Sequence, residues 1–279
     1  MSLAHPDSLV LRGLRHTDLA AAHRLSAAMS WPHRLEDWRL LRLLGQGLAA
    51  CNGAGELLGT TMWWRFGASA CTLGMVLVAS SQQGRGIGRR LMQAALEQIG
   101  PRALMLNATA AGLALYQKLG FHPAGVVVQH QGVLAAAPEA AGTRAARPSD
   151  RAALLALDTL AFGAARGALL DRLLHDGDCR VIEAEGVVTG FAFRRRFGRG
   201  ELVGPVVAAD EAGAIALVAA SLRPGFQRID IAADATGLGA WLARAGLPAV
   251  DTVTTMTRGG WPARAGLARR FALATQATG

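Results

Sequence analysis

Residues 76–91 read Val76-Leu77-Val78-Ala79-Ser80-Ser81-Gln82-Gln83-Gly84-Arg85-Gly86-Ile87-Gly88-Arg89-Arg90-Leu91. The first residues end a nearly continuous apolar run, 71–79, which is typical of a strand covered on both faces. Glycines at alternate positions follow and lead into a helical pattern over 91–99. Glycines let successive backbone N–H groups turn toward one anion, and a helix N-terminus adds the positive end of its dipole. The stretch therefore predicts a phosphate-binding loop between a buried strand and a helix.

Two common nucleotide-binding motifs do not fit this loop. Its glycines do not satisfy G-x-G-x-x-G, and no G-K-[ST] follows to make a P-loop. Gln83, Gly86 and Gly88 instead match [Q/R]-x-x-G-x-[G/A], so the loop resembles the signature of the GNAT superfamily of N-acetyltransferases. The resemblance implies that acetyl-CoA is the cosubstrate and that the loop binds the pyrophosphate of coenzyme A. The residues assigned to this role are Gln83, Gly84, Arg85, Gly86, Ile87, Gly88 and Arg89.

A second motif lies further along the chain. Residues 115–121, Leu-Tyr-Gln-Lys-Leu-Gly-Phe, resemble the family's L-Y-x-K-x-G-F, and Tyr116 is the single tyrosine of the protein. The resemblance implies that its hydroxyl lies near the coenzyme sulfur. A phenol of pKa near 10 stays protonated at neutral pH and can protonate a departing thiolate. We therefore expect Tyr116 to act as the general acid, with a packing role as the alternative.

The implied reaction is direct attack of an amine on the acetyl thioester. The negative charge that develops on the carbonyl oxygen needs a fixed hydrogen-bond donor. In the family this donor is a backbone amide where the fourth strand separates from the fifth, and Val76 is the best candidate here. The pantetheine arm pairs with the same strand edge, so Leu77 and Val78 are expected to line it.

The chain departs from the family pattern in two places. Relatives often carry an asparagine seven residues before the tyrosine, where this chain has Thr109, while Asn107 lies two residues earlier. Either side chain could hydrogen-bond the pantetheine. Many relatives place a catalytic glutamate on the fourth strand, but residues 73–79 contain no ionisable side chain. The general base stays unassigned, and three groups near the expected acceptor pocket are better explained as solvated or packed: Glu36, Asp37 and His130.

Three segments of the chain recur in order at a spacing of about 130 residues, which indicates a duplication. They are 12–18 and 144–150, 55–67 and 186–198, and 73–79 and 203–209. The second copy lacks the chemical groups of the first. Its counterpart of the glycine loop carries Asp210 and Glu211, which would repel a pyrophosphate. Trp241 or Leu242 stands where the first copy has its tyrosine.

The resemblance implies an α/β (α+β) fold with two tandem GNAT domains, each a mixed central sheet flanked by helices. We expect residues 1–134 to form the acetyltransferase domain with the acetyl-CoA site and residues 143–279 to form a degenerate GNAT-like domain. The segment 134–142, rich in alanine with a proline and a glycine, is the expected linker. Within the first copy, 49–52 and 57–66 flank turn residues and predict a hairpin.

Composition narrows the possible partners. The 279 residues are 51% hydrophobic, enough for a sizeable core in each domain, and no apolar run approaches a membrane span. Three cysteines without CxxC spacing argue against disulfides and metal, and we expect a cytoplasmic protein. The net charge of +9 comes almost wholly from scattered arginines, which argues against a nucleic-acid partner. A homodimer is left open.

The sequence thus predicts an N-acetyltransferase that modifies the primary amine of a small molecule or an amino-acid-like acceptor. Two alternatives remain open. One is acetylation of a protein amino group. The other is a module that senses acetyl-CoA without turnover, since no general base is visible in the sequence.

Overall fold

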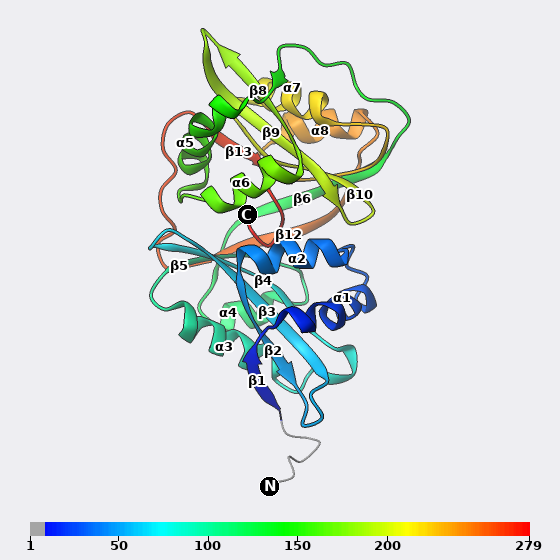
Figure 1. Cartoon of the computed structure of the whole chain (residues 1–279), viewed down its shortest axis with the longest axis vertical. Helices are drawn as coiled ribbons and strands as arrows, with labels where there is room; N and C mark the ends of the chain where they lie inside the picture. The colour runs from blue at the N-terminus through cyan, green and yellow to red at the C-terminus, as the bar shows by residue number, and fades with distance from the viewer. Residues whose placement is uncertain (1–8) are drawn as a thin grey trace.

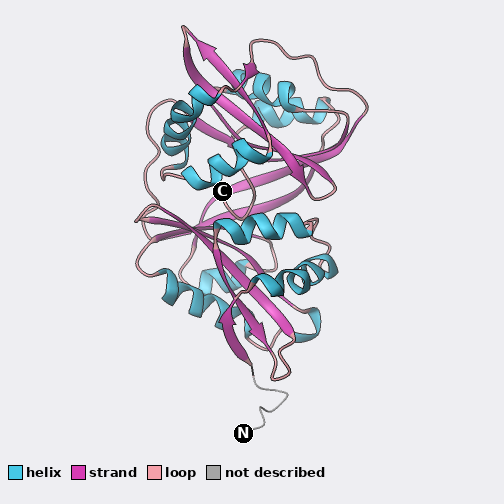
Figure 2. Cartoon of the chain, in the orientation of Figure 1, coloured by secondary structure: helices cyan, strands magenta, loops and turns pink. Residues whose placement is uncertain are grey.

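Each half of the chain follows the same order of elements in the computed structural model, which describes residues 9–279 (Figures 1 and 2). The first half contains β1 (Val10–Gly13), α1 (Leu19–Ala28), α2 (Leu35–Leu44), β2 (Gln46–Cys51), β3 (Leu57–Phe66), β4 (Ala70–Val78), α3 (Ile87–Ile99), β5 (Ala103–Ala108), α4 (Leu113–Lys118) and β6 (His122–Leu134). The second half contains β7 (Arg144–Ala145), α5 (Arg151–Phe162), α6 (Gly167–Asp176), β8 (Asp178–Ala184), β9 (Val187–Phe197), β10 (Gly200–Ala208), α7 (Glu211–Ser221), β11 (Gly225–Ala232), α8 (Thr236–Arg244) and β12 (Ala249–Arg258). A further strand, β13 (Arg269–Ala272), has no counterpart in the first half. The duplication expected from the sequence is confirmed.

The two halves also share the same contacts at the turn before the first helix. Arg12 forms an ion pair with Asp18 at 2.6 Å, and Arg144 forms the corresponding pair with Asp150 at 2.7 Å. In each copy the carboxylate also accepts a backbone N–H three residues earlier, at 2.7 Å. The same contacts therefore fix the start of the first helix in both halves.

The strands form one continuous sheet of 13 strands in the order β1-β2-β3-β4-β5-β12-β6-β11-β13-β10-β9-β8-β7. The expectation of two separate sheets is wrong, because each half gives its last long strand to the other. Strand β12 lies between β5 and β6, and β6 pairs along its other edge with β11. Figure 1 shows β6 and β12 crossing the middle of the molecule between the two halves. Segment 135–143 joins β6 to β7 and contains all of the expected linker except Leu134, which ends β6.

Helices cover both faces of the sheet in the first half, which is why β4 is apolar on both sides. On one face α1 and α2 bury Leu19, Trp38 and Leu41 against the strands. On the other face α3 packs through Leu91, Met92 and Ala95. No helix among residues 9–279 is long and apolar enough to cross a membrane.

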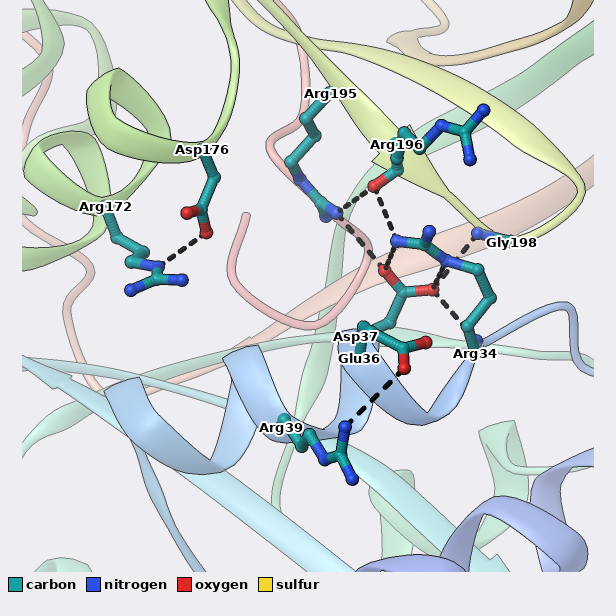
Figure 3. A network of polar contacts seen from close by, with 9 residues as sticks. All are labelled: Arg34, Glu36, Asp37, Arg39, Arg172, Asp176, Arg195, Arg196 and Gly198. Carbon is teal, nitrogen blue, oxygen red and sulfur yellow. Dashed lines mark hydrogen bonds and ion pairs between the residues drawn. The ribbon is translucent and has the colours of Figure 1, made fainter.

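An ion-pair network ties α2 to the second half (Figure 3). Asp37 is buried and accepts hydrogen bonds from the Arg34 side chain at 3.0 and 3.1 Å and from the Arg34 backbone at 2.9 Å. Across the junction it accepts the backbone N–H of Gly198 at 3.1 Å and lies 3.5 Å from Arg195 of β9. Burial alone would raise the pKa of Asp37, but these donors outweigh it and lower the pKa. Asp37 is thus a structural carboxylate at the interface of the halves.

Replacing Asp37 with asparagine is expected to lower the free energy of unfolding at pH 7 by about 3 kcal/mol, because Arg195 then stays buried without its counter-charge. A depressed folded-state pKa gives stability above the unfolded carboxyl pKa of about 4, and that stability is lost as the pH falls through the folded value. The difference between wild type and Asp37→Asn should therefore shrink below about pH 4. Urea unfolding at pH 7 and pH 3 measures both values. Glu36→Gln, at the exposed neighbouring position, is the control and should change little; an equal effect at both pH values would contradict the role given to Asp37.

Candidate functional site

Strands β4 and β5 run parallel and then separate. Their pairing extends from Ala70 opposite Ala103 to Leu73 opposite Leu106 and stops there. Beyond that point, residues 74–78 of β4 have no strand on this side among the described residues. A wedge-shaped gap in the pairing therefore leaves backbone groups of β4 free to bind something other than a strand.

A β-bulge at Met75 shapes this edge. The register with β3 shifts between Thr60 and Met62, and Met75 has a φ of 52°, a left-handed conformation that costs a non-glycine residue about 1–2 kcal/mol. Because of the bulge, odd-numbered residues of β4 point to one face of the sheet before Met75 and to the opposite face from Met75 onward. Leu73 belongs to the core under α3, whereas Met75 and Leu77 belong to the core under α1 and α2.

The bulge aims one amide into the wedge. The Thr60 hydroxyl donates to the carbonyl oxygen of Met75 at 2.8 Å, so this carbonyl points toward β3. In a trans peptide the N–H points opposite to the C=O, and the N–H of Val76 therefore faces the open edge. This is the residue that the sequence singled out as the amide donor.

The next two residues alternate as a strand requires. Leu77 is fully buried and pairs with Thr60, so its backbone groups face β3. By alternation those of Val78 face the wedge, and its carbonyl oxygen accepts a hydrogen bond from the Gln83 side chain at 3.2 Å. Val78 thus presents its backbone to the wedge, whereas Leu77 contributes only to the core beside it.

The glycine-rich loop follows directly. Gly84 and Gly86 both have φ of 77°, and a Cβ at either position would meet nothing within 4 Å, so backbone conformation and not packing requires glycine there. Gly86 precedes α3 and offers no capping side chain, which leaves the first N–H groups of the helix free. The side chains of Arg85 and Arg89 are exposed beside this helix start, and Ile87 turns inward to the core. These residues fit a bound diphosphate: free amides, the positive end of a helix and two guanidinium groups.

Tyr116 lies in α4 with its ring buried against Phe121, at 6.2 Å between ring centroids. Gly112 leaves room for the ring, since a Cβ there would lie 2.8 Å from Tyr116 Cε2. Val76 and Val78 pack against the same apolar cluster, so Tyr116 lies on the α3 side of the wedge. Burial raises the pKa of Tyr116 to about 12, which keeps the phenol protonated at neutral pH.

The two candidate pantetheine ligands have different surroundings. Asn107 accepts a hydrogen bond from the Thr255 hydroxyl of β12 at 2.7 Å and donates to the carbonyl oxygen of Gln276 at 2.8 Å. Its amide therefore joins β5 to the second half, and a contact with the coenzyme stays a prediction. Thr109 is exposed and lines the neighbouring cavity.

A cavity of about 360 Å³ opens beside Gly74 and Met75, on the α1–α2 side of the wedge. Both halves line it. The first half contributes the loop 30–33, Gly74, Met75, Asn107, Thr109, Gln129 and Gln131, and the second contributes Phe197, Arg199, Leu202, Arg228, Asp230, Val250, Asp251, Thr275, Gln276 and Ala277. The sequence predicts that the degenerate domain helps to shape or cover the acceptor pocket, but it does not name the residues that do so, because their positions depend on the exchange of β6 and β12.

None of the three side chains considered near the acceptor pocket lines this cavity. Glu36 is exposed and pairs with Arg39 at 3.6 Å, and Asp37 belongs to the interface network. His130 is buried, its Nδ1 lies 2.8 Å from the Leu247 carbonyl oxygen, and it packs beside α8 of the second half. His33 does line the cavity; burial lowers its pKa to about 4, so it is neutral at pH 7.

In the second half the corresponding wedge is filled by the chain itself. Strand β13 pairs with Val206–Ala208 of β10 and with Ile231 of β11. The approach is close, since a Cβ at Gly204 would lie 1.9 Å from the carbonyl oxygen of Leu273. At the start of α7 the Asp210 side chain accepts the N–H of Gly213 at 2.8 Å, so a carboxylate takes the place of an external anion. Residues 9–279 also contain no group of three or more His, Cys, Asp or Glu side chains arranged to hold a metal ion.

Comparison with known proteins also finds one domain in each half of the chain. The family described as Acetyltransferase (GNAT) domain matches residues 45–123, and a second model with this description matches residues 154–268. The uncharacterized N-acetyltransferase YitH of Bacillus subtilis (strain 168) is 31% identical over 225 residues, which cover 77% of this chain and 79% of the relative. A putative acetyltransferase from Pyrococcus horikoshii has the same fold, with a TM-score of 0.80 at 18% identity over 100% of this chain and 99% of that one. A tandem GNAT protein from the clavulanic acid biosynthesis pathway matches with a TM-score of 0.64 at 17% identity over 90% and 98% of the two chains.

The hydrogen bonds of Asn107 predict how the segment after β13 is held. Asn107→Ala leaves the Thr255 hydroxyl and the Gln276 carbonyl without this partner, so local opening of residues 273–279 should become easier by about 1–2 kcal/mol. We expect their amide hydrogen exchange, measured by mass spectrometry, to accelerate about tenfold. Thr109→Ala, which lines the same cavity without contacting this segment, is the control. Unchanged exchange in Asn107→Ala would show that other contacts hold the segment.

Proposed function

This chain belongs to the GNAT family of N-acetyltransferases, and we propose that it transfers the acetyl group of acetyl-CoA to the primary amine of a small molecule or an amino-acid-like acceptor. The observation that carries the proposal is the wedge between β4 and β5, where a free amide, a glycine loop and a cavity meet. We further propose that residues 1–134 supply the coenzyme site and that residues 143–279 complete the acceptor side. Residues 1–8 of this division lie outside the described part of the chain.

The glycine loop and α3 are the proposed binding site for the coenzyme pyrophosphate. The amides of Gly84, Gly86, Ile87 and Gly88 lie in the loop and the first turn of the helix, where a negative charge is stabilised by the helix dipole. Arg85 and Arg89 add positive charge at the surface of the loop, and Gln83 holds it to the end of β4. The pantetheine arm would then lie along the free edge at Val76 and Val78, satisfying backbone groups that have no strand beside them.

Bound acetyl-CoA supplies an acetyl group activated as a thioester. In our proposal the acceptor nitrogen attacks the carbonyl carbon from the cavity side, the C–N bond forms and the C–S bond breaks. The Val76 amide donates a hydrogen bond to the carbonyl oxygen as negative charge develops there. Tyr116 gives its phenolic proton to the departing thiolate, and its raised pKa keeps the phenol protonated until that step. The nitrogen of the new amide loses its extra proton to solvent and the Tyr116 phenolate takes one back from solvent, so the products are the N-acetylated acceptor and the free thiol of coenzyme A.

The cavity favours a small acceptor over a protein amino group. It has a volume of about 360 Å³, and its walls come from the loop 30–33, the hairpin of β9 and β10, and the segment 275–277. Such walls suit a molecule of amino-acid size better than an extended polypeptide. Acetylation of a protein and acetyl-CoA sensing without turnover remain the alternatives, and turnover on an amine panel separates the sensor from both enzymes.

We expect one coenzyme A to bind per chain, because β13 fills the second wedge and Asp210 takes the helix start there. Calorimetry should give a stoichiometry near one. Gly86→Asp adds strain at a positive φ and a negative charge beside the pyrophosphate, so affinity should fall on the order of 10²-fold or more. Gly55→Asp is a matched control, since Gly55 has φ of 83° with nothing within 4 Å but lies in the β2–β3 turn. Two equivalent sites, or full affinity in Gly86→Asp, would refute the assignment.

Tyr116→Phe tests the general acid. The substitution keeps the ring that packs on Phe121 and removes one hydroxyl, so folding and coenzyme affinity should change little. General acid catalysis is typically worth about 10²- to 10⁴-fold, and we expect kcat to fall near the low end because solvent can protonate a thiolate. The KM for acetyl-CoA should stay nearly constant. Ser69→Ala, which removes an exposed hydroxyl in the β3–β4 turn, is the control; full kcat in Tyr116→Phe with chemistry rate-limiting would return Tyr116 to a packing role.

A further inference from the structure

The floor of the cavity is a row of polar side chains across neighbouring strands. Arg228 and Asp230 lie on the same face of β11, and their register partners on β6 are Gln131 and Gln129. Asp251 of β12 lies opposite Gln129 from the other edge of β6. Alternate residues of a strand share a face, so the exchange of β6 and β12 assembles this row at the centre of the sheet.

Two of these side chains are buried charges. Arg228 is 7% exposed and Asp230 1% exposed, and the guanidinium binds the carboxylate through Nε at 3.1 Å and Nη2 at 2.9 Å. Charges taken out of water are costly even when paired, and well-packed apolar residues often serve stability as well. Both side chains also line the cavity, which places this buried pair where a bound ligand would meet it.

The guanidinium groups of the cavity retain unused hydrogen-bonding capacity. Among the described residues, Nη1 of Arg228 has no hydrogen-bond partner, because the contacts to Asp230 use only Nε and Nη2. Arg199, exposed in the turn between β9 and β10, has neither a hydrogen bond nor an ion pair from its side chain within residues 9–279. Both line the same cavity, and a guanidinium is the group that binds carboxylate with the best-matched geometry.

The charges on the cavity wall also limit the net charge of the ligand. Arg199 and Arg228 are balanced by Asp230 and Asp251, and His33 is neutral at pH 7. A wall with no net charge favours a molecule that carries both signs over a polyanion or a polyamine. Near the wedge, at Gly74 and Met75, the described lining residues carry no charge. The amine that reacts at the wedge and the anion bound at the floor thus lie at different ends of one acceptor.

We propose that the acceptor is an amino acid or a similar amine with a carboxylate, and that Arg228, assisted by Arg199, binds this carboxylate. The inference rests on the proposed acetyltransferase function and names its specificity-determining residues. Asp230 holds the Arg228 side chain in place through Nε and Nη2 and leaves Nη1 without a partner among the described residues. The second half, which lacks chemistry of its own, thereby selects the substrate of the first.

Matched pairs of amines test the proposal with the full-length enzyme. Each pair joins an amino acid to the amine that lacks only its carboxylate, such as lysine with 1,5-diaminopentane, ornithine with 1,4-diaminobutane, and β-alanine with ethylamine. For the best pair we expect kcat/KM for the acid to exceed that for the decarboxylated amine on the order of 10²-fold, the value of a charged hydrogen-bonded contact. Equal or better use of the decarboxylated amines would overturn the proposal while leaving the acetyltransferase function intact. No transfer to any amine, with acetyl-CoA still bound, would instead refute the proposed function.

A double variant assigns the preference to the pair. Arg228→Gln with Asp230→Asn removes both charges together and keeps hydrogen-bonding groups of similar size, which avoids leaving one buried charge alone. The acid-to-amine ratio should fall to near one while acetyl-CoA affinity, measured by calorimetry, stays at the wild-type value. Arg144→Gln with Asp150→Asn makes the same chemical change at a partly buried pair outside the cavity and should keep the ratio. A ratio that survives in the Arg228 and Asp230 variant overturns the assignment. If that variant fails to fold, Arg228→Lys is the substitute, because it keeps the positive charge but loses the planar guanidinium that can bind a carboxylate through two N–H groups. It should still lower the acid-to-amine ratio, and an unchanged ratio counts against the proposal.

Discussion

Backbone hydrogen-bonding groups inside a sheet need partners, and this requirement organises the molecule. In the first half, the bulge at Met75 separates β4 from β5 and turns the Val76 amide toward an edge with no strand beside it. A bound coenzyme arm can satisfy that edge. In the second half, the same separation between β10 and β11 is satisfied by β13. The same separation of two strands thus leaves a free edge in the first half, where we propose that the coenzyme binds, and is filled by β13 in the second half.

The exchange of β6 and β12 determines what surrounds the slot. Because each strand pairs with the opposite half, the two sheets merge and the cavity lies at their junction. The floor of the cavity comes from β11, β6 and β12, and its covering segments come from the loop 30–33 and the β9–β10 turn. Asp37 and Arg195 hold α2 against the second half just beside this covering loop. The cavity that we propose for the acceptor is therefore formed jointly by both copies.

Local signals in the sequence predicted the secondary structure around the glycine loop well. The glycine loop, the hairpin of β2 and β3, the apolar strand β4 and the duplication all depend on neighbours within about 10–20 residues or on direct self-similarity. The strand exchange could not be read in the same way, because β6 and β12 are compatible with pairing inside either half. The hydrogen-bond partners of Asn107 and His130 could not be predicted for this reason, since Thr255, Gln276 and Leu247 lie in the other half of the chain. Arg228 and Asp230 gave no signal, because two charges at alternate positions of a strand usually mark a solvated face.

Strand β13 and the residues that follow it also contact both copies. After leaving the second wedge, the chain continues through Leu273, whose N–H binds the Asp230 carbonyl oxygen, to Ala277, which packs against Gly74 at the first wedge. A single segment of nine residues or so therefore touches both equivalent positions of the duplicated fold. The separated strands of the second copy thus hold the start of a segment whose end lines the cavity beside the first wedge. The packing of the second copy and the shape of the cavity beside the first therefore depend on the same stretch of chain.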